Sequence, residues 1–157
     1  MNIFYLDKCP VKAAEYQYNK HVVKMVLESA QMLCSAHHVC GNPEDIPYKQ
    51  AHINHPCTKW VRESVLHYKW LYDHMIALGK EYTNRYSKQH LTITKCKIPL
   101  LKSPAWIPFA YWKQPPQAMP DEYKDNCSIK AYWNYYIGEK HTVAHKHEEI
   151  YKIIPNE

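Results

Sequence analysis

Titratable side chains recur along one predicted helix near the N-terminus, at spacings that place them on a common polar face. They are Glu15, Lys20, His21, Lys24 and Glu28. A carboxylate beside ammonium groups and an imidazole can bind phosphate and transfer protons. The same spacing also occurs on an ordinary solvated face, where Lys24 and Glu28 would pair across one helical turn. The pattern by itself leaves both interpretations open.

Histidines and cysteines are concentrated between residues 34 and 57. Such nitrogen and sulfur donors can hold a tetrahedral zinc ion, and the candidate ligands are Cys34, His37, His52 and His55. A nucleotide enzyme of this kind would join these histidines to His21 or a cysteine. The spacings match no standard zinc finger or ribbon, and cysteine is often buried for packing alone. We therefore expect no cofactor, with zinc as the alternative.

Cationic and aromatic side chains alternate on a second predicted helix and beyond it. Cations bind the phosphodiester backbone and aromatic rings stack on bases. A solubilising surface over an aromatic core would have the same composition. The candidates for nucleic-acid contact are Lys20, Lys59, Arg62, Arg85, Trp106 and Trp112.

Three long helices are expected to position these groups. Hydrophobic periodicity and proline positions predict helices over about 10–37 and 58–86, and a third from between 121 and 128 to about 153. The apolar arc of the second helix is broad, which indicates a central position.

Six prolines between residues 91 and 120 exclude a long helix there, and the alternation at 92–94 allows at most a short strand. Loops this rich in proline and aromatic residues usually lie packed over a core. We therefore expect an all-α fold, a single domain over 1–157 with three principal helices and this loop region covering the core.

The overall composition is that of a globular protein. The chain has 157 residues, 46% of them hydrophobic, and only 3 glycines, which disfavours a hairpin-rich β fold. Its net charge of +5 permits a polyanionic partner without requiring one. No apolar run reaches the length of a membrane span and no secretory leader is evident. We expect a cytoplasmic protein with reduced cysteines and no membrane partner.

Two resemblances follow from local strings. The chain resembles a family of short, mostly phage-encoded proteins, a likeness that implies a host-cell location and no particular reaction. It also resembles the phage pyrimidine-dimer DNA glycosylases of the endonuclease V type. The strings that carry the second resemblance are AEY at 14–16, HP at 55–56 and YWNYYIG at 132–138.

The second resemblance implies an all-α domain that attacks the C1′ carbon of a damaged nucleotide with its N-terminal α-amine, bends double-stranded DNA and flips a base. The position that matches the family's catalytic glutamate is Tyr18, so Glu15, one turn away, would supply the carboxylate. Asn2 is too large for routine removal of the initiator, so the amine would belong to Met1. His21 and Lys24 would complete the site as phosphate or sugar contacts.

The expected function is therefore that of a DNA-processing protein, a DNA N-glycosylase and AP lyase acting on damaged or modified pyrimidines. Two alternatives stay open. One is a non-catalytic phage module that binds nucleic acid or a host protein, and the other is the metal-dependent nucleotide enzyme.

Overall fold

Helices account for all the regular secondary structure in the described part of the chain. The computed structural model describes residues 1–143, and no strand occurs among them. The all-α prediction is confirmed. The helices are α1 (Pro10–Glu15), α2 (Asn19–Cys40), α3 (Pro56–Glu63), α4 (Val65–Tyr86), α5 (Leu91–Cys96) and α6 (Ser128–Gly138), with 3-10 turns at Asp121–Tyr123 and Lys140–Val143.

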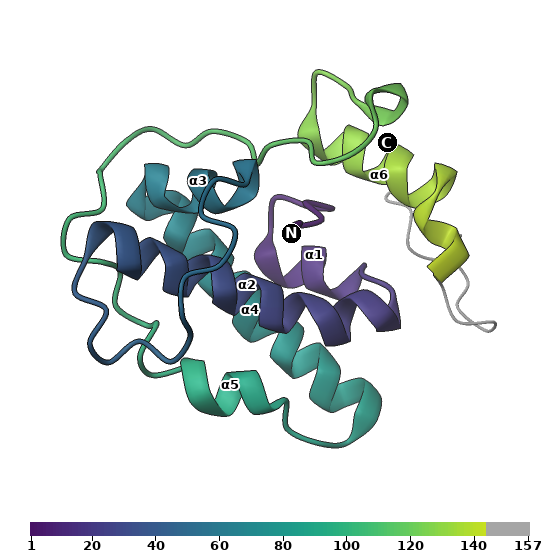
Figure 1. The fold of residues 1–157 in the computed structure, drawn as a ribbon. Coiled ribbons are helices and arrows are strands. Elements are labelled where there is room, and N and C mark those ends of the chain that lie inside the picture. The colour runs from purple at the N-terminus through teal and green to yellow at the C-terminus, as the bar shows by residue number, and fades with distance from the viewer. Residues whose placement is uncertain (144–157) are drawn as a thin grey trace.

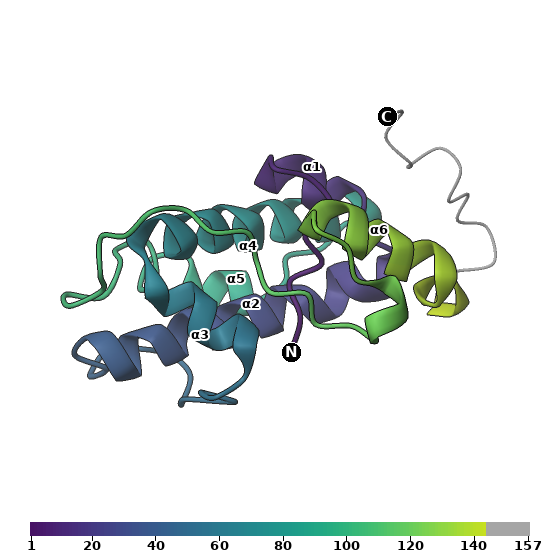
Figure 2. The same ribbon diagram turned by 90° about the horizontal axis from the view of Figure 1, so that it is seen from above.

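Helices α2 and α4, of 22 residues each, form the centre of the molecule. They pack on each other, α1 packs on α4, and α3 packs on both. Helix α4 is central, as its broad apolar arc predicts. Helix α6 lies to one side, at the end of the long loop, and the N-terminal segment runs between α6 and the other helices (Figures 1 and 2).

The prediction of one helix over 10–37 is wrong, because the chain breaks at residues 16–18. Tyr18 is extended, with φ −60° and ψ 153°. The guanidinium of Arg85 holds the break: Nη1 donates to the carbonyl of Gln17 at 2.7 Å and Nη2 to that of Glu15 at 3.0 Å. The partner that satisfies these carbonyls is some 70 positions away, so local periodicity does not show the break.

The prediction of one helix over 58–86 is also wrong, because Ser64 separates α3 from α4. Ser64 has an extended backbone, with φ −157° and ψ 144°. Its hydroxyl accepts from the amide of Leu66 at 3.2 Å and donates to the carbonyl of Ala110 at 2.7 Å. A serine cap of this kind starts a new helix without any proline or glycine.

Residues 92–94, expected to be irregular or at most a short strand, belong to helix α5. The Nδ1 atom of His90 accepts from the amide of Thr92 and caps the helix at its start. The side chain of Ile93 is buried over Gly79 of α4, where a Cβ would lie 2.5 Å from its Cγ1 atom. This tertiary contact, rather than local propensity, decides the conformation.

The last predicted helix ends earlier than expected. Helix α6 stops at Gly138 and a 3-10 turn follows. The remainder of the predicted helix, 144–153, lies outside the described residues.

The loop after α5 packs over the core, as expected. The indole of Trp60 donates to the carbonyl of Lys113 at 2.9 Å, and the ring of Trp112 lies 5.5 Å from that of Trp60. Trp106 and Tyr111 instead point outward, 72% and 95% exposed. One apolar core is shared by all six helices and the N-terminal segment, which makes residues 1–143 a single compact unit. Within that range, no helix has both the length and the apolar character needed to cross a lipid bilayer.

Candidate active site

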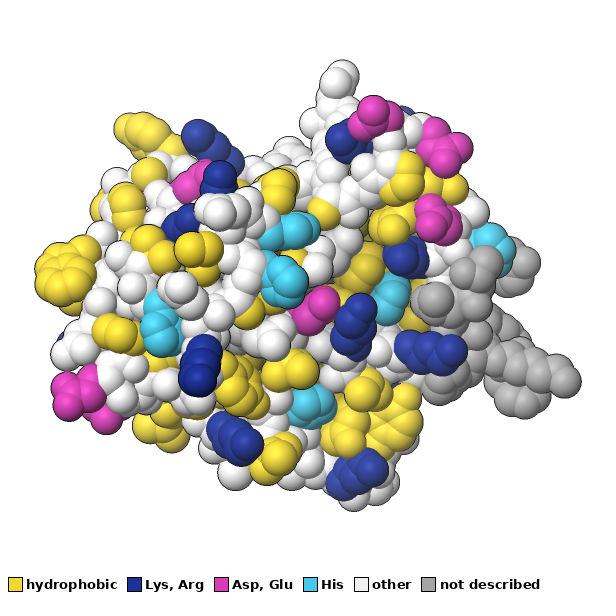
Figure 3. Space-filling view, in the orientation of Figure 1, with side chains coloured by type: hydrophobic (Ala, Val, Ile, Leu, Met, Phe, Trp, Pro, Cys, Tyr) yellow, Lys and Arg dark blue, Asp and Glu magenta, His cyan; other side chains and the backbone are white. Residues whose placement is uncertain are grey.

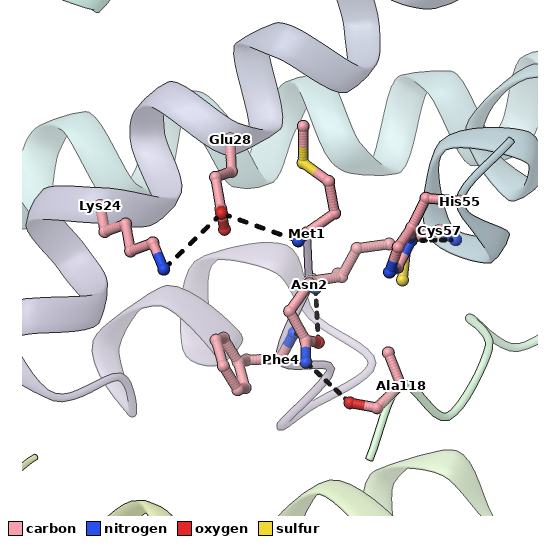
Figure 4. Close-up of polar contacts among 9 residues, drawn as sticks. Met1, Asn2, Phe4, Lys24, Glu28, His55, Cys57 and Ala118 are labelled. Carbon is pink, nitrogen blue, oxygen red and sulfur yellow. Dashed lines mark hydrogen bonds and ion pairs between the residues drawn. The ribbon is translucent and has the colours of Figure 1, made fainter. Parts of the chain in front are cut away.

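A pocket of about 410 Å³ opens where the N-terminal segment meets α2, the start of α3 and α6. Figure 4 shows several of the residues that line it. The polar and charged lining residues are Met1, Asn2, His21, Lys24, Glu28, His55 and Lys140.

The N-terminal segment is fixed in place by its own second residue. The Oδ1 atom of Asn2 accepts from the amides of Ile3 and Phe4 at 2.7 and 3.2 Å, and its Nδ2 donates to Ala118 at 3.0 Å (Figure 4). Phe4 has a φ of +55°, rare for a bulky residue. Its ring stacks on His21, with centroids 4.2 Å apart and planes 11° from parallel. Met1, directly before Asn2, is held in place by these contacts, and its side chain is only 1% exposed.

The α-amine of Met1 lies beside the carboxylate of Glu28. Its nitrogen is 3.8 Å from Oε1 of Glu28, and Nζ of Lys24 is also 3.8 Å from that oxygen, on the other side (Figure 4). The second oxygen, Oε2, is buried and has no hydrogen-bond partner among the described residues. A buried carboxylate oxygen without a partner costs free energy in the unbound protein. Within the part of the chain that the structure describes, the charge of this carboxylate is therefore balanced only by the two long contacts to Met1 and Lys24.

His55 lies near the same amine. It precedes α3, and its Nδ1 accepts from the amide of Cys57 at 3.1 Å, which assigns the proton of the neutral ring to Nε2. Burial lowers the pKa of His55, and the positive charge of the N-terminus and His52 lower it further. Because the Cys57 amide occupies Nδ1, the neutral ring is left with an Nε2–H group that can donate a hydrogen bond.

His21 is almost fully buried, at 7% exposed. Its Nδ1 is 2.6 Å from the hydroxyl of Tyr136 on α6. Burial, with smaller effects of Lys140 and Lys24, lowers the pKa of His21 to about 4. The ring is therefore neutral near pH 7 and joins Phe4 to α6. Its role as a phosphate or sugar contact stays a prediction.

Three of the four predicted catalytic residues, Met1, His21 and Lys24, line this pocket. Glu15 does not: its side chain is exposed in a different cleft, between α1 and α4. The break at residues 16–18 separates the polar positions of α1 from those of α2. The carboxylate that lines this pocket is that of Glu28, and its spacing after His21 and Lys24 was the available signal.

The candidates for nucleic-acid contact are divided among several places. Lys59, Arg62 and Trp106 share one groove, whereas Trp112 lines another with Tyr5 and Trp70. Lys20 is exposed on the first turn of α2. Arg85 is occupied within the protein by the carbonyls of residues 15 and 17, and by Asn19 and Glu81.

The candidate zinc ligands have separate surroundings. Cys34 is buried, and Nε2 of His37 is 2.8 Å from the hydroxyl of Tyr68. His52 is exposed in the loop before α3, with a φ of +47°. Within residues 1–143, no three His, Cys, Asp or Glu side chains are grouped so that they could hold a metal ion. The six cysteines are free thiols.

Comparison with known proteins identifies the family. No curated protein and no solved structure matches the chain. The family model described as pyrimidine dimer DNA glycosylase matches residues 1–94. That range includes Met1, Glu28 and His55, and thus the α-amine and the groups around it. More than half of the chain is covered, and the protein therefore belongs to the pyrimidine dimer DNA glycosylase family.

Proposed function

We propose that this protein is a DNA N-glycosylase and AP lyase that acts on damaged or modified pyrimidines, with the α-amine of Met1 as nucleophile and Glu28 as the catalytic carboxylate. The observation that carries the proposal is the 3.8 Å approach of the amine to a carboxylate whose second oxygen is buried and unpartnered. The family match over residues 1–94 supports it.

The first chemical step is displacement of the base. The unprotonated amine attacks C1′, the bond from C1′ to the base nitrogen breaks, and the base leaves with the bonding electrons and takes up a proton. Once the nitrogen loses one of its two protons, the sugar ring opens, O4′ takes up a proton, and the product is an iminium, still carrying one N–H, that links Met1 to the sugar. The carboxylate of Glu28 stabilises the positive charge that develops on the sugar and on this nitrogen.

The second step breaks the strand. Loss of a proton from C2′ of the iminium expels the 3′ phosphate, and water then releases the sugar from the amine. The carboxylate of Glu28, which lies beside the amine, is the group in the pocket that can accept the C2′ proton.

The pocket also suits a flipped nucleotide. Its volume of about 410 Å³ lies within the range of small-molecule sites. The ammonium groups of Lys24 and Lys140 outnumber the single carboxylate of Glu28, which favours an anionic substrate.

Borohydride trapping tests the proposal. Duplexes with ultraviolet photoproducts or an abasic site are incubated with protein and borohydride, which reduces an iminium to a stable amine. We expect a covalent protein–DNA adduct attached at Met1, located by peptide mass spectrometry, and intact mass establishes the N-terminus.

A short N-terminal extension converts the nucleophile into an amide and is expected to abolish the adduct. The same extension at the C-terminus is the matched control. Absence of any adduct with the unmodified protein, or an adduct that survives the N-terminal extension, contradicts the proposal. A salt-sensitive gel shift without product would favour the non-catalytic DNA-binding alternative.

A further inference from the structure

A second groove, of about 590 Å³, lies at the far end of α3 from the active-site pocket. Helix α3 and the long loop supply its cations, Lys59, Arg62 and Lys113, and one carboxylate, that of Glu63, partly balances them. The ring of Trp106, 72% exposed, forms part of the wall. The groove thus combines an excess of two positive charges with an exposed aromatic face, and both favour nucleic acid.

Hydrogen bonds hold the loop backbone and the side chain of Arg62 at this groove, whereas the ammonium groups of its two lysines have no such contacts among residues 1–143. The amide of Trp106 donates to Cys40 at 2.7 Å, and Nη1 of Arg62 donates to Ile53 at 2.7 Å. The amide of Lys113 donates to Nε2 of His67 at 3.0 Å. The ammonium groups of Lys59 and Lys113 have no hydrogen-bond or ion-pair partner within the described residues. Exposed cations on an anchored backbone need little reorganisation to bind phosphates.

Helix α3 connects this groove to the active-site pocket. His55, directly before the helix, lines the pocket, and Arg62 and Glu63 at its end line the groove. Eight residues at about 1.5 Å each separate the two by about 12 Å. Lys and Arg side chains gather over α3 at the upper left of Figure 3 and again right of centre, on one face of the molecule. DNA seated on the pocket can therefore continue over α3.

We propose that this groove binds the phosphate backbone of duplex DNA on one side of the flipped nucleotide, about three to four nucleotides away at about 3.4 Å of rise each. Lys59 and Lys113 contact phosphates, and the ring of Trp106 packs against a sugar or base edge. The inference rests on the proposed function for its partner. Trp106 and Lys113 lie beyond residues 1–94, so this contact extends past the part of the chain that matches the family.

Binding to asymmetrically truncated duplexes tests the groove. Fluorescence anisotropy is measured on duplexes with one abasic site and either two long flanks or one flank cut to two base pairs, on one side or the other. Unmodified protein is expected to lose affinity when one particular flank is cut and to keep it when the other is cut.

The double variant K59A/K113A is expected to bind the long duplex roughly tenfold more weakly and to be insensitive to which flank is cut. Two lost phosphate contacts reduce the slope of log K against log salt by about 1.8. W106A is expected to weaken binding without changing this slope. K80A is the matched control, because Lys80 lines the separate cleft between α1 and α4. Thermal unfolding confirms that each variant is folded.

The proposed DNA contact at the groove is overturned if the double variant keeps the salt slope and the flank preference of the unmodified protein. It is also overturned if the unmodified protein shows no flank preference. A protein ligand at this site would produce the same unchanged slope. Borohydride trapping on the long duplex separates the two proposals. Flank-dependent binding without an adduct contradicts only the proposed function. An adduct without flank-dependent binding contradicts only the proposed DNA contact at the groove.

Discussion

Replacing Glu28 by glutamine provides the sharpest test of the active site. E28Q preserves the size of the side chain and removes the negative charge beside the α-amine of Met1. Two unit charges about 4 Å apart interact by about 4 kcal/mol at an effective dielectric constant of about 20, and each 1.36 kcal/mol is about tenfold in rate. Because Glu28 is 14% exposed, solvent screens part of this energy. We expect adduct formation to slow by about 10²- to 10³-fold.

The measurement is single-turnover borohydride trapping on an abasic duplex with protein in excess, which separates the chemical step from DNA binding and product release. E28D is expected to retain more of the rate than E28Q, because it keeps the charge on a shorter side chain. E15Q is the matched control, since Glu15 is exposed in another cleft. The ion pairs of Glu28 are long, at 3.8 Å, so we expect E28Q to change the free energy of unfolding by less than about 1 kcal/mol.

Two results would refute this reasoning. One is an E28Q rate within about threefold of the unmodified protein, which would mean that no charge stabilisation comes from this carboxylate. The other is an E15Q loss as large as that of E28Q, which would return the catalytic role to α1. A lower trapping rate in E28Q accompanied by a large fall in unfolding temperature would indicate a folding defect. The rate of E28D, which keeps the charge, then decides between a folding defect and a catalytic one.

Three further outcomes are expected. R85A should lower the free energy of unfolding in urea by about 2–3 kcal/mol, because Arg85 satisfies backbone carbonyls at the break between α1 and α2. DNA affinity should stay nearly unchanged. A loss of affinity without a loss of stability would contradict this prediction. Burial lowers the pKa of both His21 and His74 to about 4, from a value near 6.5 in the unfolded chain. As pH falls from about 6.5 to about 4, these histidines are protonated in the unfolded chain but not in the folded protein, so the free energy of unfolding decreases; near pH 5 these two rings take up about 2 protons on unfolding. Denaturant titrations at several pH values measure this decrease, and a free energy of unfolding that does not change with pH would refute the prediction. G79A should destabilise the protein by about 1–3 kcal/mol in thermal or urea unfolding, because the new Cβ would meet Ile93. Adding I93A should recover part of this loss in the double variant. A G79A protein that is more stable than the unmodified protein would show that α5 does not pack against Gly79.

Much of the fold was predictable from the sequence. The all-helical class of residues 1–143, the two long amphipathic segments and the irregular proline-rich loop follow from spacing and from residue types, because an amphipathic helix records its buried face in its own periodicity. The helix breaks at residues 16–18 and at Ser64 did not follow. Each is stabilised by a partner far along the chain, Arg85 in one case and Ala110 in the other.

The candidate site was predictable only in part. Met1, His21 and Lys24 do share a pocket, since two of them lie on one face of α2 and the resemblance directed attention to the α-amine. Glu15 does not lie in this pocket. The sequence pattern predicts one continuous helix through residues 16–18, where tertiary contacts break it. His55 appeared as a candidate metal ligand, and nothing in its local sequence indicates that it lies beside the N-terminus.

The sequence alone determined the helical class, the polar face of α2 and the chemistry that its side chains can perform, since these depend on residue types a few positions apart. Only the tertiary structure decided which carboxylate meets the α-amine. That choice depends on the N-terminal segment, held between α2 and α6 by Asn2, Phe4 and Tyr136. Contacts that span more than a hundred residues leave no periodic trace in the chain, because they arise from the packing of whole elements.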